Sequence, residues 1–309
     1  MAVSSVNLLA MRIFISCIGL VGNIFLILSI IQTKFSRIKT FELFLLGLAT
    51  ANLEEIVIVN IYDIIILLQP PSTTTGTWSC RSLKFLTVLG ESTSILFTVL
   101  ISIFRYQKLR GANKRVNLPI YLDSIRSAWM VSGVSVMISM LLCVPIFFIN
   151  VQGSMENITR NSGDCTPDFF QCSKDYCPIL NYSYKYLFTV VCIMLPLIIV
   201  TVTSCLIITV LLSQRKTVAP VASISGSSQF GKKRKGPWLQ RSTISVLAAL
   251  GLFQVDWTLY LIFQLSFSST DFPIWAEIEF FISTSYTSIS PYVYGIGNNM
   301  LSLKNLIKK

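Results

Sequence analysis

The sequence predicts an all-α membrane protein, a seven-transmembrane helix bundle with a short C-terminal amphipathic helix. Hydrophobic residues make up 53% of the 309 residues and charged residues only 13%, which is about half of the ~25% that soluble domains carry. The apolar residues gather in seven runs, each longer than the ~20 residues that a helix needs to cross a bilayer core ~30 Å thick. Because lipid offers no hydrogen-bond partner to an exposed backbone amide, each run is expected to be a helix.

The seven predicted helices are joined by polar segments. Their runs are too long and too evenly apolar for the strands of a transmembrane barrel, which span ~9–11 residues and alternate in polarity. The first run is longer than the apolar part of a signal peptide and is followed by Lys34, Arg37 and Lys39, so it is expected to remain as a helix. The predicted helices cover residues 8–31, 41–68, 80–106, 126–151, 184–213, 243–267 and 273–296 of a single domain over residues 1–309.

The distribution of charge predicts the orientation of the chain. The first, third and fifth connections and the C-terminal tail are basic, whereas the second, fourth and sixth connections are not. Basic connections usually face the cytoplasm, so we expect a multi-pass protein of the plasma membrane with an extracellular N-terminus and a cytoplasmic C-terminus. The net charge of +11 then lies on one face, where contact with anionic membrane lipids accounts for it. Nucleic acid is not an expected partner.

The fourth connection carries features that are typical of an extracellular segment. Asn157 and Asn181 each begin an Asn-X-Ser/Thr sequence and are predicted glycosylation sites. Three cysteines lie in the same connection and Cys80 opens the third helix on the same side, where an oxidising exterior permits disulfides. Four cysteines allow three pairings, which stay open; the loop cysteines are Cys165, Cys172 and Cys177. Four further cysteines lie within predicted helices and are expected to be buried thiols: Cys17, Cys143, Cys192 and Cys205.

Several kinds of chemistry have no support in the sequence. The chain contains no histidine, which excludes a histidine-based catalytic triad and a His-ligated metal. There is no Gly-rich phosphate loop, so we expect no enzyme activity, no cofactor and no metal. A transporter or channel remains an alternative, but the sequence lacks the internal repeats and broken helices that are typical of transporters.

Acidic residues within the predicted helices are candidates for function, because ionisable groups in a bilayer usually face the interior of the bundle. Glu91 lies 11 residues after Cys80 and 14 before Arg105, or roughly 16 Å and 21 Å along a helix, near the middle of the membrane. Glu91 is either a ligand contact or a neutral, hydrogen-bonded carboxyl. Glu55 has the same two interpretations. The other acids are Glu54, Asp63, Asp256, Glu277 and Glu279.

A set of landmark residues resembles the rhodopsin-type G-protein-coupled receptors. Cys80 and Arg105 are separated by 25 residues, the spacing that this family uses, and residues 299–309 form the predicted amphipathic helix, with Leu301, Leu303, Leu306 and Ile307 apolar. The other landmarks follow in order along the chain: Gly22-Asn23, Leu48-Ala49-Thr50-Ala51-Asn52-Leu53, Arg105-Tyr106, Trp129, Pro196 and Ser290-Pro291-Tyr292-Val293-Tyr294.

The departures from that pattern are similar to those of the vomeronasal type 1 receptors. Phe104 stands before Arg105 in place of an acid, Asn52 replaces an Asp, and the sixth helix has no proline. The third helix ends in Ser102-Ile103-Phe104, as in many members of that group. Bitter taste receptors share these departures and remain an alternative, although they usually lack the cysteine that Cys80 provides. Without an acidic neighbour, Arg105 lacks the usual local ion pair, so raised basal activity is expected.

The resemblance implies the location of a ligand site and of a G-protein surface. A small-molecule chemosignal, a pheromone or odorant, would bind inside the bundle, and a heterotrimeric G protein would bind on the cytoplasmic face around Arg105, Tyr106 and Tyr294. For Arg81 and Lys84, near the mouth, contact with an anion and reach to the membrane interface both stay open. Cys80 would pair with a loop cysteine. The expected ligand-binding residues are Lys84, Thr87, Val88 and Glu91 in the third helix, Asp256, Trp257 and Tyr260 in the sixth, and Glu279 in the seventh.

Overall fold

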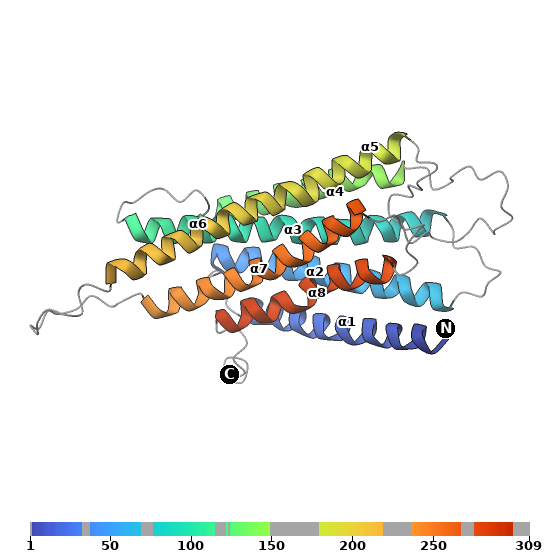
Figure 1. The fold of residues 1–309 in the computed structure, drawn as a ribbon, viewed down its shortest axis with the longest axis horizontal. Helices are drawn as coiled ribbons and strands as arrows, with labels where there is room; N and C mark the ends of the chain where they lie inside the picture. Colours follow the sequence, from blue (N-terminus) through green and yellow to red (C-terminus); the bar gives the residue numbers. More distant parts are fainter. Residues whose placement is uncertain are drawn as a thin grey trace, which may run out of the picture.

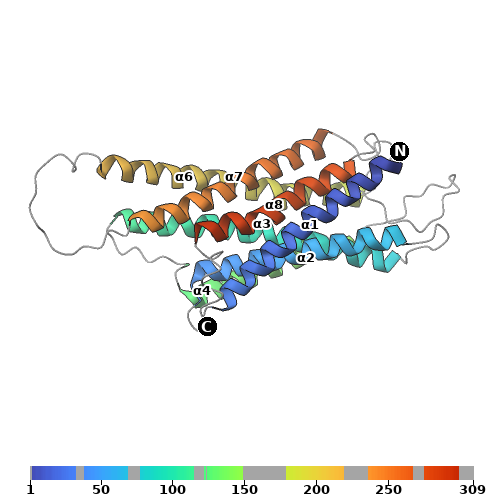
Figure 2. The same cartoon turned by 90° about the horizontal axis from the view of Figure 1, so that it is seen from below.

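The computed structural model describes residues 2–32, 38–68, 77–114, 122, 124–148, 179–218, 236–266 and 275–298. These residues form a bundle of helices that run back and forth along one long axis (Figures 1 and 2). The predicted all-α bundle of seven membrane helices is confirmed, and no strand occurs among the residues just given. The expected amphipathic helix over residues 299–309 lies outside them.

The seven crossings are built from the helices labelled in Figure 1. The fourth crossing ends in a 3-10 turn, and the fifth is one continuous rod made of α5, a π-helical segment and α6. Their bounds are α1 (Ala2–Ile31), α2 (Thr40–Leu68), α3 (Thr77–Lys114), α4 (Ile125–Cys143) with the 3-10 turn η2 (Val144–Phe147), α5 (Ile179–Phe188), the π segment η3 (Thr189–Met194), α6 (Leu195–Val218), α7 (Gly236–Ser266) and α8 (Trp275–Gly297).

Several of these bounds differ from the expected ones. The third crossing was expected to end at Tyr106, but α3 continues to Lys114, since the polar residues after Tyr106 are good helix formers that can leave the membrane. The fourth was expected to reach residue 151, but the α-helix stops at Cys143 and tightens into η2, whose first turn contains Pro145. Proline cannot donate the backbone hydrogen bond that would continue the helix. The fifth crossing begins earlier, at Ile179, and the sixth at Gly236.

The π segment η3 interrupts the fifth crossing just before a proline. Pro196 is the second residue of α6, and its ring conflicts with the carbonyl one turn earlier in a regular α-helix. The amide of Leu195 bonds the carbonyl of Val190, five residues back, which is the π pattern that often marks functional positions. The proline therefore accounts for the widened turn.

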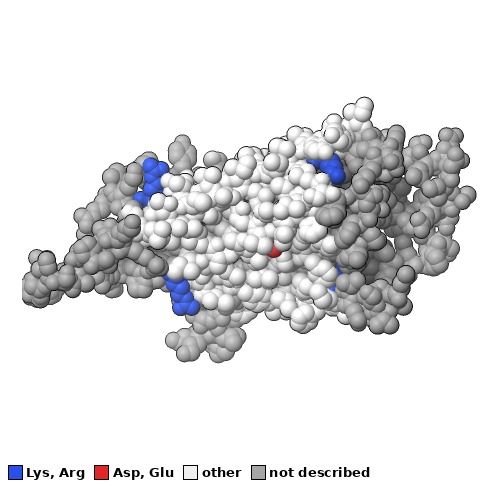
Figure 3. Space-filling view, in the orientation of Figure 1, with Lys and Arg blue, Asp and Glu red and all other residues white. Residues whose placement is uncertain are grey.

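The helices have the composition and burial of membrane spans. Six helical segments within the described part of the chain are long and apolar enough to cross a bilayer, and α8 completes the bundle by packing against α1 and α7. Apart from Arg126 near its start, the exposed side chains of α4 are apolar, for example Met130 and Leu141. Its buried side chains are small or polar: Ala128, Ser132, Ser135, Ser139 and Cys143. This inverted pattern suits a lipid-facing helix that packs closely on its neighbours. Figure 3 shows basic side chains toward the two ends of one face and an almost uncharged band between them.

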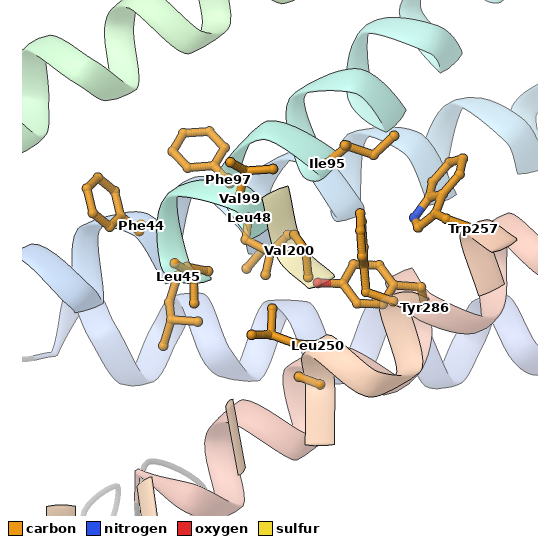
Figure 4. Close-up of a cluster of buried hydrophobic side chains, with 14 of the residues drawn as sticks. Phe44, Leu45, Leu48, Ile95, Phe97, Val99, Val200, Leu250, Trp257 and Tyr286 are labelled. Atoms are coloured by element: carbon orange, nitrogen blue, oxygen red, sulfur yellow. The ribbon is translucent and has the colours of Figure 1, made fainter. Parts of the chain in front are cut away.

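Helix α3 is the centre of the bundle. Inside its apolar segment 72% of the residues are buried, against 28% to 44% in the other five, and it contacts α2, α4, α6 and α7. The core around it includes Leu48, Ile95, Val200, Leu250 and Tyr286, each from a different helix (Figure 4). A movement of most of the other helices would therefore change the contacts of residues on α3.

Candidate functional site

A network of uncharged polar groups joins four helices in the middle of the bundle. The side-chain amide of Asn52 donates to Asn23 Oδ1 at 3.4 Å and to Ser290 Oγ at 3.3 Å, and its oxygen accepts from Ser94 Oγ at 2.6 Å. Asn23 in turn donates to the carbonyl oxygens of Gly19 and Thr287. We call Asn23, Asn52, Ser94 and Ser290 the Asn52 network. Every hydrogen-bonding group of Asn52 has a partner, so the residue that replaces an Asp is held by neutral neighbours.

The expected ligand-binding residues of α3 lie along one helix face at different depths. Lys84, Thr87 and Glu91 are half-buried and Val88 is buried. The Thr87 hydroxyl donates to the carbonyl of Leu83 in its own helix at 3.0 Å, so its hydrogen-bond donor is already used.

The expected residues of α7 form an aromatic and acidic group beside α8. Trp257 and Tyr260 make an edge-to-face contact with ring centroids 5.3 Å apart, and Phe253 packs below Trp257 at 6.1 Å. The indole Nε1 of Trp257 is buried without a hydrogen-bond partner among the described residues. Asp256 Oδ2 accepts from Ser285 Oγ at 2.8 Å, which ties α7 to α8. The side chain of Glu279 lies outside the described residues.

Two acids from neighbouring helices lie together near the expected site. Glu55 on α2 is 3% exposed and interacts electrostatically with Glu91 on α3. The sequence pointed to each acid separately, but the helical periods of α2 and α3 do not reveal that the charge of one acts on the other. This pairing depends on how the helices are rotated in the bundle.

Arg81 is engaged at the start of α3. Its Nη1 donates to the carbonyl oxygen of Phe147 at 3.0 Å, at the end of η2 where the backbone has lost regular partners. Phe85, one turn along, packs against the Phe147 ring with centroids 5.0 Å apart and the ring planes tilted by 41°. Arg81 therefore fastens the fourth crossing to the third, a role that neither of the two sequence interpretations included.

Arg105 is the most constrained charged side chain near the opposite end of α3. It is 6% exposed, and its Nη2 donates to Ser242 Oγ at 2.7 Å on α7 and to Asn298 Oδ1 at 3.2 Å after α8. Its guanidinium lies 3.6 Å from the ring centroid of Phe41 on α2. We call Arg105, Ser242, Asn298 and Phe41 the Arg105 cluster. Among the described residues Arg105 has no carboxylate partner.

The remaining contacts of the Arg105 cluster close it into a network. Ser242 Oγ donates to Asn298 Oδ1 at 2.6 Å, so Asn298 accepts from both neighbours. Asn298 is fixed by its own donor bond to the Tyr294 carbonyl at 2.8 Å. Phe104 packs against Phe41 with centroids 6.3 Å apart. In place of an ion pair with the preceding residue, Arg105 contacts α2, α7 and the residue that follows α8.

The other two expected coupling residues lie close to this cluster. Tyr294 is fully buried in α8, one turn before Asn298. Tyr106 is half-buried, and its hydroxyl accepts from Arg110 Nη1 at 3.4 Å. Ser242, Asn298 and Phe41 were not expected from the sequence, because single serines, asparagines and phenylalanines near helix ends carry no distinctive spacing.

The cysteines and sequons are placed as follows. Cys17, Cys143, Cys192 and Cys205 are free thiols within helices, as predicted, but only Cys143 and Cys192 are buried, whereas Cys17 and Cys205 face outward. Asn181 is fully buried in α5, and its glycosylation stays a prediction. The side chain of Cys80, the three loop cysteines and Asn157 lie outside the described residues.

Comparison with known families matches most of the chain to one family model. The model of the seven-transmembrane receptors of the rhodopsin family matches residues 22–294, from the α1 segment with Asn23 to Tyr294 in α8. A search of curated proteins found no significant match. The matched region contains the Asn52 network and, with the exception of Asn298, the Arg105 cluster. The chain therefore belongs to the rhodopsin family of seven-transmembrane receptors.

Proposed function

We propose that this receptor detects a small chemosignal, as vomeronasal type 1 receptors do, and activates a heterotrimeric G protein. The family match carries the receptor function. The sensory assignment rests on the resemblance of Asn52, of the Ser102-Ile103-Phe104 segment and of a sixth crossing without proline to that group. The receptor would lie in the plasma membrane with its N-terminus outside, and Cys80 would bond a cysteine of the fourth connection.

The proposed ligand site lies among α3, α7 and α8. It comprises Lys84, Thr87, Val88, Glu91, Asp256, Trp257, Tyr260 and Glu279. The unpartnered indole N–H of Trp257 supports this placement, because a buried donor without a partner is costly and a ligand acceptor would satisfy it. A chemosignal shifts the receptor only if it prefers the active arrangement of these helices.

The single observation that carries the signalling mechanism is the Arg105 cluster. Arg105 joins α3 to α7 and to the end of α8 through neutral acceptors. If the end of α7 that carries Ser242 moved away from α3, the bond between Arg105 and Ser242 would break. The guanidinium would then be released toward the proposed G-protein surface with Tyr106 and Tyr294. Because the partners of Arg105 are neutral, its restraint lacks the Coulomb attraction of an ion pair, which supports the raised basal activity expected from the sequence.

Replacing Arg105 by alanine tests this mechanism. Arg105→Ala is expected to abolish G-protein activation while surface expression and ligand affinity survive, because Arg105 lies about 21 Å from Glu91 along α3. The measurement is a dose–response curve in cells that express a set of G-protein biosensors, with a panel of amines, aromatic acids and steroids. Lys185→Ala, a half-buried cation of α5 outside the Arg105 cluster, is the matched control.

Three outcomes would contradict the proposal. Full signalling by Arg105→Ala would remove Arg105 from the coupling mechanism. Responses confined to bitter compounds would move the receptor to the bitter taste group, and ligand-gated ion flux without G-protein activation would favour the transporter or channel alternative.

A further inference from the structure

The interior of α7 contains one glycine, Gly251, which packing does not explain. Gly251 is exposed near the middle of the helix, and nothing among the described residues lies within 4 Å of the position that its Cβ would occupy. By contrast, a Cβ atom on Gly19, Gly22 or Gly90 would press on a neighbouring helix. Glycine destabilises the interior of a helix relative to alanine. The helix therefore carries a weak point at Gly251 where alanine would fit and would be more stable.

The residues after Gly251 fasten α7 to α6. Gln254 donates from Nε2 to the Leu197 carbonyl of α6 at 3.2 Å, and its Oε1 accepts from the Thr201 hydroxyl at 3.0 Å. We call Leu197, Thr201 and Gln254 the α6–α7 clasp. Thr201 is exposed and Gln254 is half-buried, so the clasp lies toward the lipid, where no water competes for its hydrogen bonds.

The same part of α7 is also fastened to α8. The Ser285 hydroxyl donates to Asp256 Oδ2 at 2.8 Å. The Phe253 ring makes an edge-to-face contact with the Tyr286 ring, with centroids 5.4 Å apart. The second half of α7, residues 252–266, is therefore held on two sides.

The first half of α7, residues 236–250, carries the contact that the proposed signalling mechanism breaks. Ser242 bonds Arg105 and Asn298 in the Arg105 cluster. It lies nine residues before Gly251, about 14 Å along the helix. If the second half stays fastened, the first half can leave α3 only by bending the helix before the clasp. No proline follows Pro237 in α7, so a proline kink does not supply this bend.

We propose that Gly251 is the hinge of activation, on which the first half of α7 swings away from α3 while the α6–α7 clasp holds the second half in place. This inference rests on the signalling mechanism proposed above. Hinges are a few positions that absorb a change in backbone angles, and they are often small residues. Glycine suits this role because it loses the least when its backbone leaves helical geometry. Thr201 and Gln254 are positioning residues that set where the helix bends.

The test measures this movement directly in the full-length receptor in nanodiscs. Spin labels are attached to non-canonical amino acids at positions Ile125 on α4 and Ile244 on the first half of α7, both exposed, so the native cysteines stay unlabelled. Helix α3 contacts both α4 and α7 and lies between them in the two ribbon views (Figures 1 and 2). A swing of α7 away from α3 therefore lengthens the distance between the labels. Ser242→Ala releases the restraint without a ligand and is expected to increase the long-distance population.

Gly251→Ala is the variant that tests the hinge. In the Ser242→Ala receptor it is expected to reduce the long-distance population by about twofold to fivefold, the ratio that corresponds to the ~0.5–1 kcal/mol by which a helix interior favours alanine over glycine. Gly133→Ala on α4, which also has open space around its Cβ, is the matched control and should leave the population unchanged. Adding Ala248→Gly to Gly251→Ala moves the glycine by one turn on the exposed side of α7. Because composition is kept and the glycine still precedes the clasp, most of the population should return.

A second pair of labels tests the clasp. Labels at Ile198 on α6 and Leu259 on α7, both exposed, report the spacing between α6 and the second half of α7. Their distances should be the same in wild type and in Ser242→Ala, because the clasp holds. Gln254→Leu in the Ser242→Ala receptor should broaden the distance distribution. Gln264→Leu is the matched control, since the side-chain oxygen of Gln264 has no hydrogen-bond partner among the described residues.

The outcomes separate the hinge from the receptor function. Equal long-distance populations in Gly251→Ala and Gly133→Ala, or no such population in any variant, would overturn the hinge. A change at the second label pair in Ser242→Ala, or none in Gln254→Leu, would overturn the clasp. The same variants are compared in cells for G-protein activation without ligand. The expected distances without any G-protein activation would leave the hinge standing and contradict the receptor function proposed above.

Discussion

Single polar side chains in the interior determine how the helices of this receptor hold one another. Asn52 occupies a position where related receptors carry an Asp, and its amide supplies donors to Asn23 and Ser290 that a carboxylate lacks. Arg105 is satisfied by Ser242 and Asn298 instead of a neighbouring acid. At position 52 a neutral amide replaces the acid that the resemblance would predict, and at position 105 neutral side chains replace the acidic partner. Each departure belongs to its own network of hydrogen bonds.

Removing the Ser242 hydroxyl tests whether the Arg105 cluster restrains activation. A hydrogen bond to a charged group contributes roughly 1.5–3 kcal/mol, so Ser242→Ala is expected to shift the equilibrium toward the active state and raise basal signalling severalfold. The measurement is ligand-free G-protein activation at equal surface expression. Ser132→Ala, a buried serine of α4 without a hydrogen-bond partner among the described residues, is the matched control. Basal signalling equal to wild type would show that the cluster does not restrain α7.

An aspartate at position 52 tests the neutral network. Asn52→Asp replaces a donor by an oxygen that faces Asn23 Oδ1, so a buried acceptor loses its partner at a cost of about 1–3 kcal/mol. The melting temperature of the purified receptor is expected to fall. Asn60→Asp is the control, since Asn60 donates only to the Ile56 carbonyl of its own helix. A variant as stable as wild type would refute the role assigned to the Asn52 amide.

At the scale of helices, close approaches through small residues replace the hydrophobic effect, which is weak between helices in lipid. Helix α1 lies against α8 along such a contact: the hydroxyls of Ser288 and Tyr292 donate to the Ile15 and Ile18 carbonyls of α1. Gly22 follows one turn after Ile18 and leaves room for the Tyr292 ring. The first and last crossings are thereby joined directly.

Gly22→Ala is expected to disrupt this contact. Its Cβ would lie 2.6 Å from the Tyr292 ring and 2.9 Å from Pro291 Cγ, and forcing a methyl group into a packed contact costs about 1–3 kcal/mol. Surface expression and melting temperature should both fall. Gly133→Ala has open space around it and should gain about 0.5–1 kcal/mol from helix propensity. Opposite signs for the two variants support the packing argument, and a stable Gly22→Ala would contradict it.

For the whole molecule, the central position of α3 connects the proposed ligand site to the proposed coupling surface. Glu91 and Arg105 lie on the same helix, α3, which contacts α2, α4, α6 and α7. A shift of α7 relative to α3 would therefore change the contacts of both the proposed ligand site and the Arg105 cluster. The orientation of this helix across the membrane decides which end meets the chemosignal.

The proposed orientation has a direct test in intact cells. An epitope tag at the N-terminus is expected to bind antibody on unpermeabilised cells, whereas a tag after Lys309 should bind only after permeabilisation, because basic connections are retained in the cytoplasm. Removal of Asn157 by substitution with Gln is expected to increase gel mobility if this residue carries the glycan. An inaccessible N-terminal tag on surface-expressed receptor would reverse the proposed topology.

The sequence by itself determined the fold class, because seven apolar runs in a chain with few charges have one stable solution in lipid, a bundle of helices. It also indicated Arg105, Glu91 and Asn52 as notable, since each is a polar residue within an apolar run. It placed the end of the fourth crossing less well, where Pro145 reshapes the last turn. It also missed the π segment before Pro196 and the burial of Asn181.

Only the tertiary structure decided which of these residues meet. Gly90 meets the backbone of Ala51 and Glu55 where α2 and α3 approach, and Arg105 meets Ser242 and Asn298 across 137 and 193 positions of sequence. Helical periodicity gives the direction of a side chain around its own axis, but not the rotation of that axis relative to its neighbours. That rotation is set by packing of the whole bundle, which is a property of all seven helices at once.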